Sequence, residues 1–199
     1  MRVIGINASP RKNANTQTLV EAILQGAAKR GAETRLVNLR EIDANGCLGC
    51  DGCKKHLGRC VQKDDMTSLM QEMTTFDAIV LGTPVYWYQV TAQFKMLVDR
   101  LWCFIEMGVD PETGGETVRS EFPPGKKFVL VISRGDPEPP PFFPQFYRHL
   151  DEWLNIIPLS LGAGQIEFFH QRGAHMDRKA ALNDPDLLEK AGATGASLV

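Results

Sequence analysis

The feature that most constrains this chain is a repeated alternation between short apolar runs and longer segments with helical spacing. Residues 2–7 (RVIGIN) are apolar and β-branched and end at a turn signal, which predicts a buried strand. From Thr16 to Arg30 the apolar positions follow the spacing of a helix, and Gly31 predicts its end. Strand-like runs separated by helix-like segments indicate βαβ units, whose strands lie parallel in one sheet.

The alternation continues to the end of the chain and predicts an α/β fold, a doubly wound five-stranded parallel sheet with helices on both faces. The other expected strands are 33–39, 78–82, 126–133 and 165–171, and the other expected helices are one opening at Asp64-Asp65, then 91–104, 143–157 and 184–198. We expect a single domain over residues 1–199, because this length suits one core and no linker or repeat interrupts it. Residues 106–125 show no regular pattern and predict a long lid or interface loop.

Composition and charge narrow the range of partners. The chain has 43% hydrophobic residues and a formal net charge of −2, so we expect neither nucleic acid nor a membrane surface as a partner. The first apolar run is too short for a signal peptide, and no run reaches the length of a membrane span. We therefore expect a cytoplasmic protein, in which cysteines stay reduced and serve metal binding or redox chemistry.

Polar side chains gather in the turn after the first expected strand, GINASPRKNANTQT. In a doubly wound sheet, ligands bind beyond the carboxyl ends of the strands. The turn lacks the glycine triplet of a dinucleotide site and the Gly-Lys-Ser/Thr of a P-loop. Its hydroxyls, amides and guanidinium surround a helix N-terminus, which favours a single phosphate monoester. The alternative is a helix capped by Asn15 or Thr16 with Arg11 in solvent.

Three aromatic residues, Tyr86, Trp87 and Tyr88, follow the third expected strand. They suit a flat aromatic ligand, and Pro84 stiffens the loop that carries them. A buried cluster or a subunit contact is the alternative interpretation.

Two separated motifs, SPRKNANT and GTPVYWYQVTAQFKMLVDR, carry a resemblance to the flavodoxin-like NAD(P)H-dependent FMN reductase family, over most of residues 1–135. The resemblance implies that the FMN phosphate is held by Ser9, Arg11, Asn15 and Thr16. It also implies that the flavin is lined by Pro84, Val85, Tyr86 and Trp87, and that the third loop is closed by Arg134 and Gly135. The motif K-x3-D-R at Lys95, Asp99 and Arg100, on the third expected helix, also matches the family. The alternative is that these charged residues simply lie on a helix face exposed to solvent or in a subunit interface.

Four of the five cysteines lie within residues 47–60, in the pattern C-x2-C-x2-C-x6-C. Four thiolates in so compact a run suit a [4Fe–4S] cluster, with Cys47, Cys50, Cys53 and Cys60 as its ligands. Structural zinc usually takes two C-x2-C pairs separated by a dozen or more residues, and remains an alternative, as do four plain thiols. We interpret Cys103 as a small core residue.

With the flavin motifs, this run makes the chain resemble the iron–sulfur flavoproteins in particular. The resemblance implies a redox enzyme that takes electrons from NAD(P)H or a ferredoxin, passes them on through FMN and the cluster, and forms a homodimer or homotetramer. No side chain is indicated as a general acid or base. The alternatives are a cluster-free NAD(P)H-dependent FMN or quinone reductase, and a non-catalytic electron carrier or redox sensor. Because the cysteine run follows the second strand, we expect its loop on the flavin side of the sheet.

Overall fold

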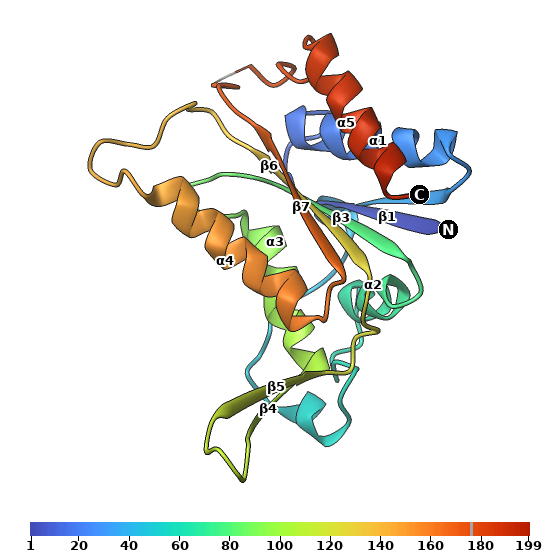
Figure 1. The fold of residues 1–199 in the computed structure, drawn as a ribbon, viewed down its shortest axis with the longest axis vertical. Helices are drawn as coiled ribbons and strands as arrows, with labels where there is room; N and C mark the ends of the chain where they lie inside the picture. Colours follow the sequence, from blue (N-terminus) through green and yellow to red (C-terminus); the bar gives the residue numbers. More distant parts are fainter. Residues whose placement is uncertain (176) are drawn as a thin grey trace.

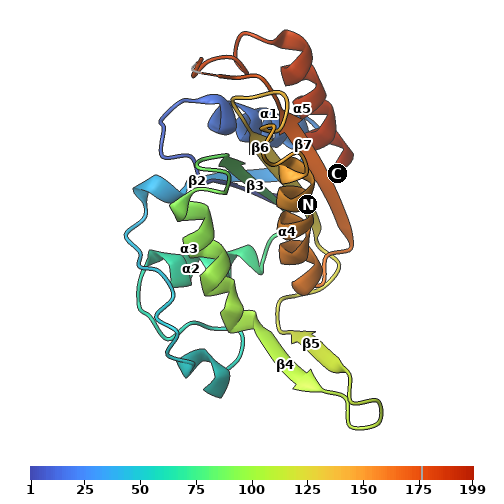
Figure 2. The same cartoon turned by 90° about the vertical axis from the view of Figure 1, so that its left-hand side faces the viewer.

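A five-stranded parallel sheet with the strand order β2-β1-β3-β6-β7 lies at the centre of the computed structural model, which describes residues 1–175 and 177–199 (Figure 1). Helices α1 and α5 cover one face of the sheet, and α2, α3 and α4 lie on the other (Figures 1 and 2). The predicted flavodoxin-like doubly wound sheet is confirmed. Its strands are β1 (Arg2–Asn7), β2 (Glu33–Asn38), β3 (Ala78–Pro84), β6 (Lys127–Ser133) and β7 (Gln165–Gln171). The helices are α1 (Asn15–Lys29), α2 (Asp65–Met73), α3 (Ala92–Leu101), α4 (Phe146–Ser160) and α5 (Pro185–Ser197).

Alternate residues of the central strands point into two separate cores. Ile4 and Ile6 of β1 pack on the side of α2, α3 and α4, whereas Val3 packs on the side of α1 and α5. All seven residues of β3 are buried. A strand covered on both faces needs apolar residues throughout, which is why these strands read as continuous apolar runs.

Close packing of α1 against α5 depends on glycines. A Cβ at Gly26 would lie 2.0 Å from the Gly192 carbonyl oxygen, and one at Gly195 would lie 1.8 Å from the Ile23 carbonyl oxygen. Only glycine permits this approach, which fixes the last helix beside the helix that follows the first loop. Among the residues described, no helix combines the length and the apolar character needed to cross a membrane.

The prediction of a long loop over residues 106–125 is wrong. Strands β4 (Ile105–Val109) and β5 (Glu116–Ser120) pair antiparallel in a hairpin that projects away from the sheet (Figures 1 and 2). After Ile105, both strands are almost wholly exposed, so they lack the apolar alternation that marks a half-buried strand. Cross-strand pairing holds the hairpin instead, including an ion pair between Arg119 and Glu106 at 3.3 Å.

Candidate functional site

Three loops meet at the carboxyl ends of β1, β3 and β6, which are neighbours in the sheet. The Ala8 N–H donates to the Gly82 carbonyl at 2.8 Å, and the Thr91 hydroxyl donates to the Ala8 carbonyl at 2.8 Å. The Val85 N–H donates to the Ser133 carbonyl at 3.0 Å, which joins the second loop to the end of β6. The residues predicted to bind flavin therefore come together at one edge of the sheet.

Side chains within the first loop (residues 8–14) fix its backbone. The Ser9 N–H donates to Asn7 Oδ1 at 3.1 Å, and the Arg11 N–H donates to Ser9 Oγ at 3.2 Å. Ser9 is buried, so its hydroxyl serves the loop from within. The Arg11 guanidinium lies 5.7 Å from the centroid of the Tyr86 ring, which places a cation between the first and second loops.

The N-terminus of α1 has no side-chain cap. Its N-cap residue is Ala14, whereas side chains cap α2, α3 and α5. The alternative in which Asn15 or Thr16 caps the helix is therefore not realised. The free N–H groups of the first turn and the positive end of the helix dipole favour an anion here. Thr16, which belongs to this first turn, is buried.

Asn15 has a role that the sequence did not indicate. Its Nδ2 donates to the Asp177 carbonyl at 2.7 Å, and its Oδ1 accepts from the Ala181 N–H at 3.0 Å. The side chain thus ties the start of α1 to the segment before α5. The predicted contact of Asn15 with phosphate stays a prediction. Because the side chain is already bonded, its backbone N–H is the group left for such a contact.

The second loop turns back sharply after Pro84. Tyr86 and Gln89 exchange two backbone hydrogen bonds of 2.8 and 3.0 Å, so Trp87 and Tyr88 form a two-residue turn. Their φ angles of 47° and 59° lie in the left-handed region, where Asn-Gly is usual and other residues are strained. Trp87 is 93% exposed, so this is not a buried aromatic cluster. Strain at an exposed aromatic pair is typical of a functional surface.

The third loop is braced against α4. Arg134 is buried, its guanidinium carbon lies 3.3 Å from the centroid of the Tyr147 ring, and its Nη2 donates to the Pro137 carbonyl at 3.1 Å. The Gly135 carbonyl accepts from the His175 N–H at 3.0 Å. The Arg134 side chain thus contacts Tyr147 and Pro137, although its buried Nε has no hydrogen-bond partner. Its part in closing the loop stays a prediction.

A half-buried polar pair near this loop gave no signal in the sequence. Asp151 of α4 and His170 of β7 approach within 3.4 Å. Burial raises the pKa of Asp151 to about 6 and lowers the pKa of His170 to about 4. The two residues belong to separate elements and share no motif spacing, so only the fold brings them together.

The four cysteines predicted as ligands line one small cavity of about 80 Å³. The thiols are free, and those of Cys47 and Cys50 are exposed. Gly49 and Asp51, with φ of 61° and 52°, provide tight turns between them. Cys103 lines the same cavity from behind, and burial raises the pKa of its thiol to about 12.

No three His, Cys, Asp or Glu side chains in the described residues are arranged to hold a single metal ion. The four thiols nevertheless line one cavity. A buried guanidinium, Arg100, faces the same cavity, and its Nε has no hydrogen-bond partner. Four thiolates and a buried cation fit an anionic iron–sulfur cluster.

The cysteine loop (residues 46–63) lies far from the flavin-side loops. Thr91, the N-cap of helix α3, is bonded to the first loop. Beyond the other end of the helix, Lys54 Nζ donates to the Trp102 carbonyl at 2.9 Å. The Gly58 N–H also donates to the Cys103 carbonyl at 2.8 Å. A helix of ten residues spans about 15 Å. The loop emerges beyond the carboxyl end of β2, as predicted, and its contacts then carry it to the far end of α3.

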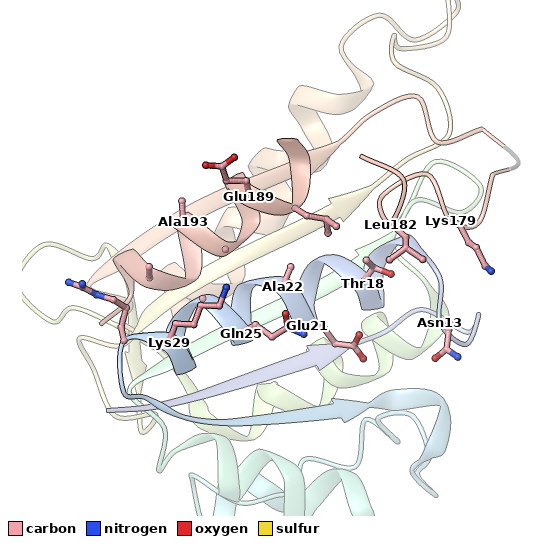
Figure 3. A pocket seen from close by; sticks show the side chains of 15 residues that line it. Asn13, Thr18, Glu21, Ala22, Gln25, Lys29, Lys179, Leu182, Glu189 and Ala193 are labelled. Carbon is pink, nitrogen blue, oxygen red and sulfur yellow. The ribbon is translucent and has the colours of Figure 1, made fainter. Parts of the chain in front are cut away.

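A cavity of about 1070 Å³ lies along the outer sides of α1 and α5 (Figure 3). Its lining mixes small residues such as Ala22 and Ala193 with Glu21, Lys29 and Glu189. None of the residues predicted to hold flavin is among those that line it. Asn13 of the first loop does line it, so the cavity adjoins the candidate site without including its predicted flavin-binding residues.

A family model described as NADPH-dependent FMN reductase matches residues 1–134. The chain belongs to this family. Membership supports flavin-dependent oxidoreductase chemistry with FMN as the cofactor. The matched residues include the first and second loops and the uncapped start of α1.

The chain is similar in sequence to curated relatives named iron–sulfur flavoprotein. One from Archaeoglobus fulgidus is 32% identical over 164 residues, which cover 82% of this chain and 68% of the relative. One from Methanocaldococcus jannaschii is 44% identical over 100 residues, covering 50% of this chain and 51% of the relative. The chain thus spans about half the length of several curated relatives that it matches.

Among solved structures, an NAD(P)H:quinone oxidoreductase from Methanothermobacter marburgensis has the same fold. The superposition has a TM-score of 0.76 and 16% sequence identity, and it covers 100% of this chain and 96% of the other.

Proposed function

We propose that this chain is an FMN-dependent oxidoreductase that also carries a [4Fe–4S] cluster, and that it passes electrons from NAD(P)H or a ferredoxin to an acceptor. The observation that carries the proposal is the first loop of a chain in the FMN reductase family. The uncapped start of α1 offers donors for one phosphate, and Arg11, three residues before the N-cap, adds a positive charge between the first and second loops.

Each flavin-side residue has a distinct task in this proposal. The N–H groups at the start of α1 and the Arg11 guanidinium bind the phosphate, and the Ser9 hydroxyl holds the loop backbone in place. Tyr86 and Trp87 cover the flavin ring and keep water from it. Bound FMN supplies the ability to accept two electrons together and release them singly.

The cysteine loop supplies the second redox site. Cys47, Cys50, Cys53 and Cys60 would ligate four irons, and the cluster would provide one-electron transfer toward a protein acceptor. Support comes from the shared cavity and from the relatives named iron–sulfur flavoprotein.

Anaerobically purified protein tests both sites. We expect one FMN, and about four irons and four sulfides, per chain, with steady-state oxidation of NAD(P)H or reduced ferredoxin. FMN with turnover but no iron would favour the cluster-free FMN or quinone reductase. FMN and iron without turnover on soluble acceptors would favour a carrier or sensor. Zinc in place of iron would contradict the cluster.

We also propose that residues 1–199 act as one domain in the cytoplasm and assemble as a homodimer or homotetramer. An apolar cavity of about 680 Å³ beside the cysteine loop supports the assembly, since it is lined by Trp102, Met107, Val118 and Ile156. All four side chains are exposed in the single chain, so a second copy would remove them from water. Light scattering at micromolar concentration tests this, and a monomer would reject it.

A further inference from the structure

Arg100 is not on a solvated face, as its motif first suggested, but is fully buried at the end of α3. Its Nη1 donates to the Asn45 carbonyl at 2.8 Å and to Asp64 Oδ2 at 2.7 Å. Its Nη2 donates to Asp64 Oδ1 at 2.9 Å and to the Thr67 hydroxyl at 2.7 Å. Asn45 and Asp64 lie just outside the two ends of the cysteine loop. One guanidinium therefore holds both ends of that loop together.

The remaining nitrogen of the guanidinium is left free. Arg100 Nε is buried without a hydrogen-bond partner, and Arg100 lines the cavity formed by the four cysteines. Cys60 lines the same cavity and is close enough to interact with the Arg100 guanidinium. A buried donor without an acceptor is costly, so Nε is available to an acceptor in the cavity beside Cys60.

A second cation near the thiols, Lys54, is held by backbone carbonyls. Lys54 Nζ donates to the Trp102 and Ile105 carbonyls and lies 3.7 Å from the centroid of the Trp102 ring. Its charge is therefore held by the backbone at the end of α3. Arg100, unlike Lys54, has a buried nitrogen with no hydrogen-bond partner.

We propose that Arg100 is a positioning residue that sets the reduction potential of the cluster through Cys60. This inference rests on the proposed function, since it assumes that the cavity holds an iron–sulfur cluster. A positive charge and a hydrogen bond to a cluster sulfur both favour the state with one more electron, so they raise the potential. Asp64 partly neutralises Arg100, so the electrostatic potential at the cluster depends on both members of the pair.

The test is an EPR-monitored redox titration of the anaerobically purified, cluster-loaded protein. Arg100→Gln leaves Asp64 negative, so we expect a shift of at least tenfold toward the oxidised state, about 59 mV lower for a one-electron couple. Asp64→Asn leaves Arg100 positive, so we expect a shift in the opposite direction. Arg100→Lys keeps the charge and should stay closer to wild type than Arg100→Gln. Arg119→Gln, which removes an exposed guanidinium from β5, should leave the potential unchanged.

Opposite shifts from the two halves of one ion pair are not expected from a merely structural role. If the loaded wild type is normal but both substitutions shift the potential the same way, or not at all, the inference is overturned and the proposed function stands. If Arg100→Gln fails to fold, Asp64→Asn still decides, because an unchanged or lowered potential contradicts the proposal. If wild-type protein holds no iron, the proposed cluster and this inference fail together.

Discussion

The first loop and the cysteine loop are both candidate cofactor sites, but they are held in different ways. The first loop is short, and buried Ser9 bonds its backbone from within, between a strand and a helix of the main fold. The cysteine loop carries exposed residues such as Leu48, which is 70% exposed, and its ends are held by Arg100 from a different element. The first loop is therefore formed by contacts local to the fold. The cysteine loop instead depends on long-range contacts and on what it binds.

The largest effect should follow from Cys50→Ala, which removes a central thiol from the cavity. We expect cluster iron to fall from about four per chain to near none, while FMN binding is retained. Electron transfer to a ferredoxin should fall at least tenfold, about 1.4 kcal/mol of barrier. Iron analysis, FMN fluorescence and stopped-flow kinetics measure these quantities. Cys103→Ala is the matched control and should keep its iron. Loss of FMN together with iron in Cys50→Ala would show that the two loops are not independent.

A stability effect of about 3 kcal/mol is expected from Asp64→Asn, the low end for breaking a buried ion pair. The Asp64 side chain is only 12% exposed, and hydrogen bonds from Arg100 hold the pKa of its carboxyl well below the ordinary value. A lowered pKa stabilises the fold fully above the ordinary pKa of about 4, and this is lost as the pH falls further.

The difference in unfolding free energy between wild type and Asp64→Asn should therefore be large at pH 7 and shrink below about pH 4. Denaturant titrations in a Cys50→Ala background measure it without interference from acid-released iron. Asp65→Asn, at the neighbouring exposed carboxylate, is the control and should show a smaller difference. A gap that stays constant with pH would argue against the Arg100–Asp64 clamp.

On the flavin side, Arg11→Ala should weaken FMN binding by about 1.5–3 kcal/mol, the range of a charge-assisted hydrogen bond. Riboflavin, which lacks the phosphate, should lose much less. Calorimetry with both ligands checks this, and Lys12→Ala, at the exposed neighbour, serves as the control. Equal losses for FMN and riboflavin would remove Arg11 from the phosphate site.

The smallest effect concerns the strained turn at Trp87. Trp87→Gly should stabilise the FMN-free protein by about 1 kcal/mol relative to Trp87→Ala, because only glycine adopts the left-handed backbone without strain. Both variants remove the aromatic ring, so both should bind FMN more weakly than wild type. Thermal unfolding with and without FMN separates the two contributions. Equal stability of the two variants would mean that the turn carries no strain.

Much of the fold could be predicted because the central strands β1, β3 and β6 are buried on both faces and the helices have one apolar side. The hairpin β4–β5 was missed since its stability comes from pairing between exposed residues such as Glu106 and Arg119, not from an apolar pattern. Among site residues, motif order located the loops, but the side-chain partners of Asn15 and Arg100 are far away in the sequence. Such contacts depend on tertiary packing, which local spacing does not encode.

The Asn15 side chain gives the molecule a thermodynamic link between its first loop and its last helix. The same residue begins α1, at the predicted phosphate site, and holds Asp177 and Ala181 in the segment before α5. A ligand that orders the start of α1 therefore also favours the docked state of that segment, and the coupling must be reciprocal. A fusion or truncation at the C-terminus, about 180 residues away along the chain, would then change the affinity for FMN.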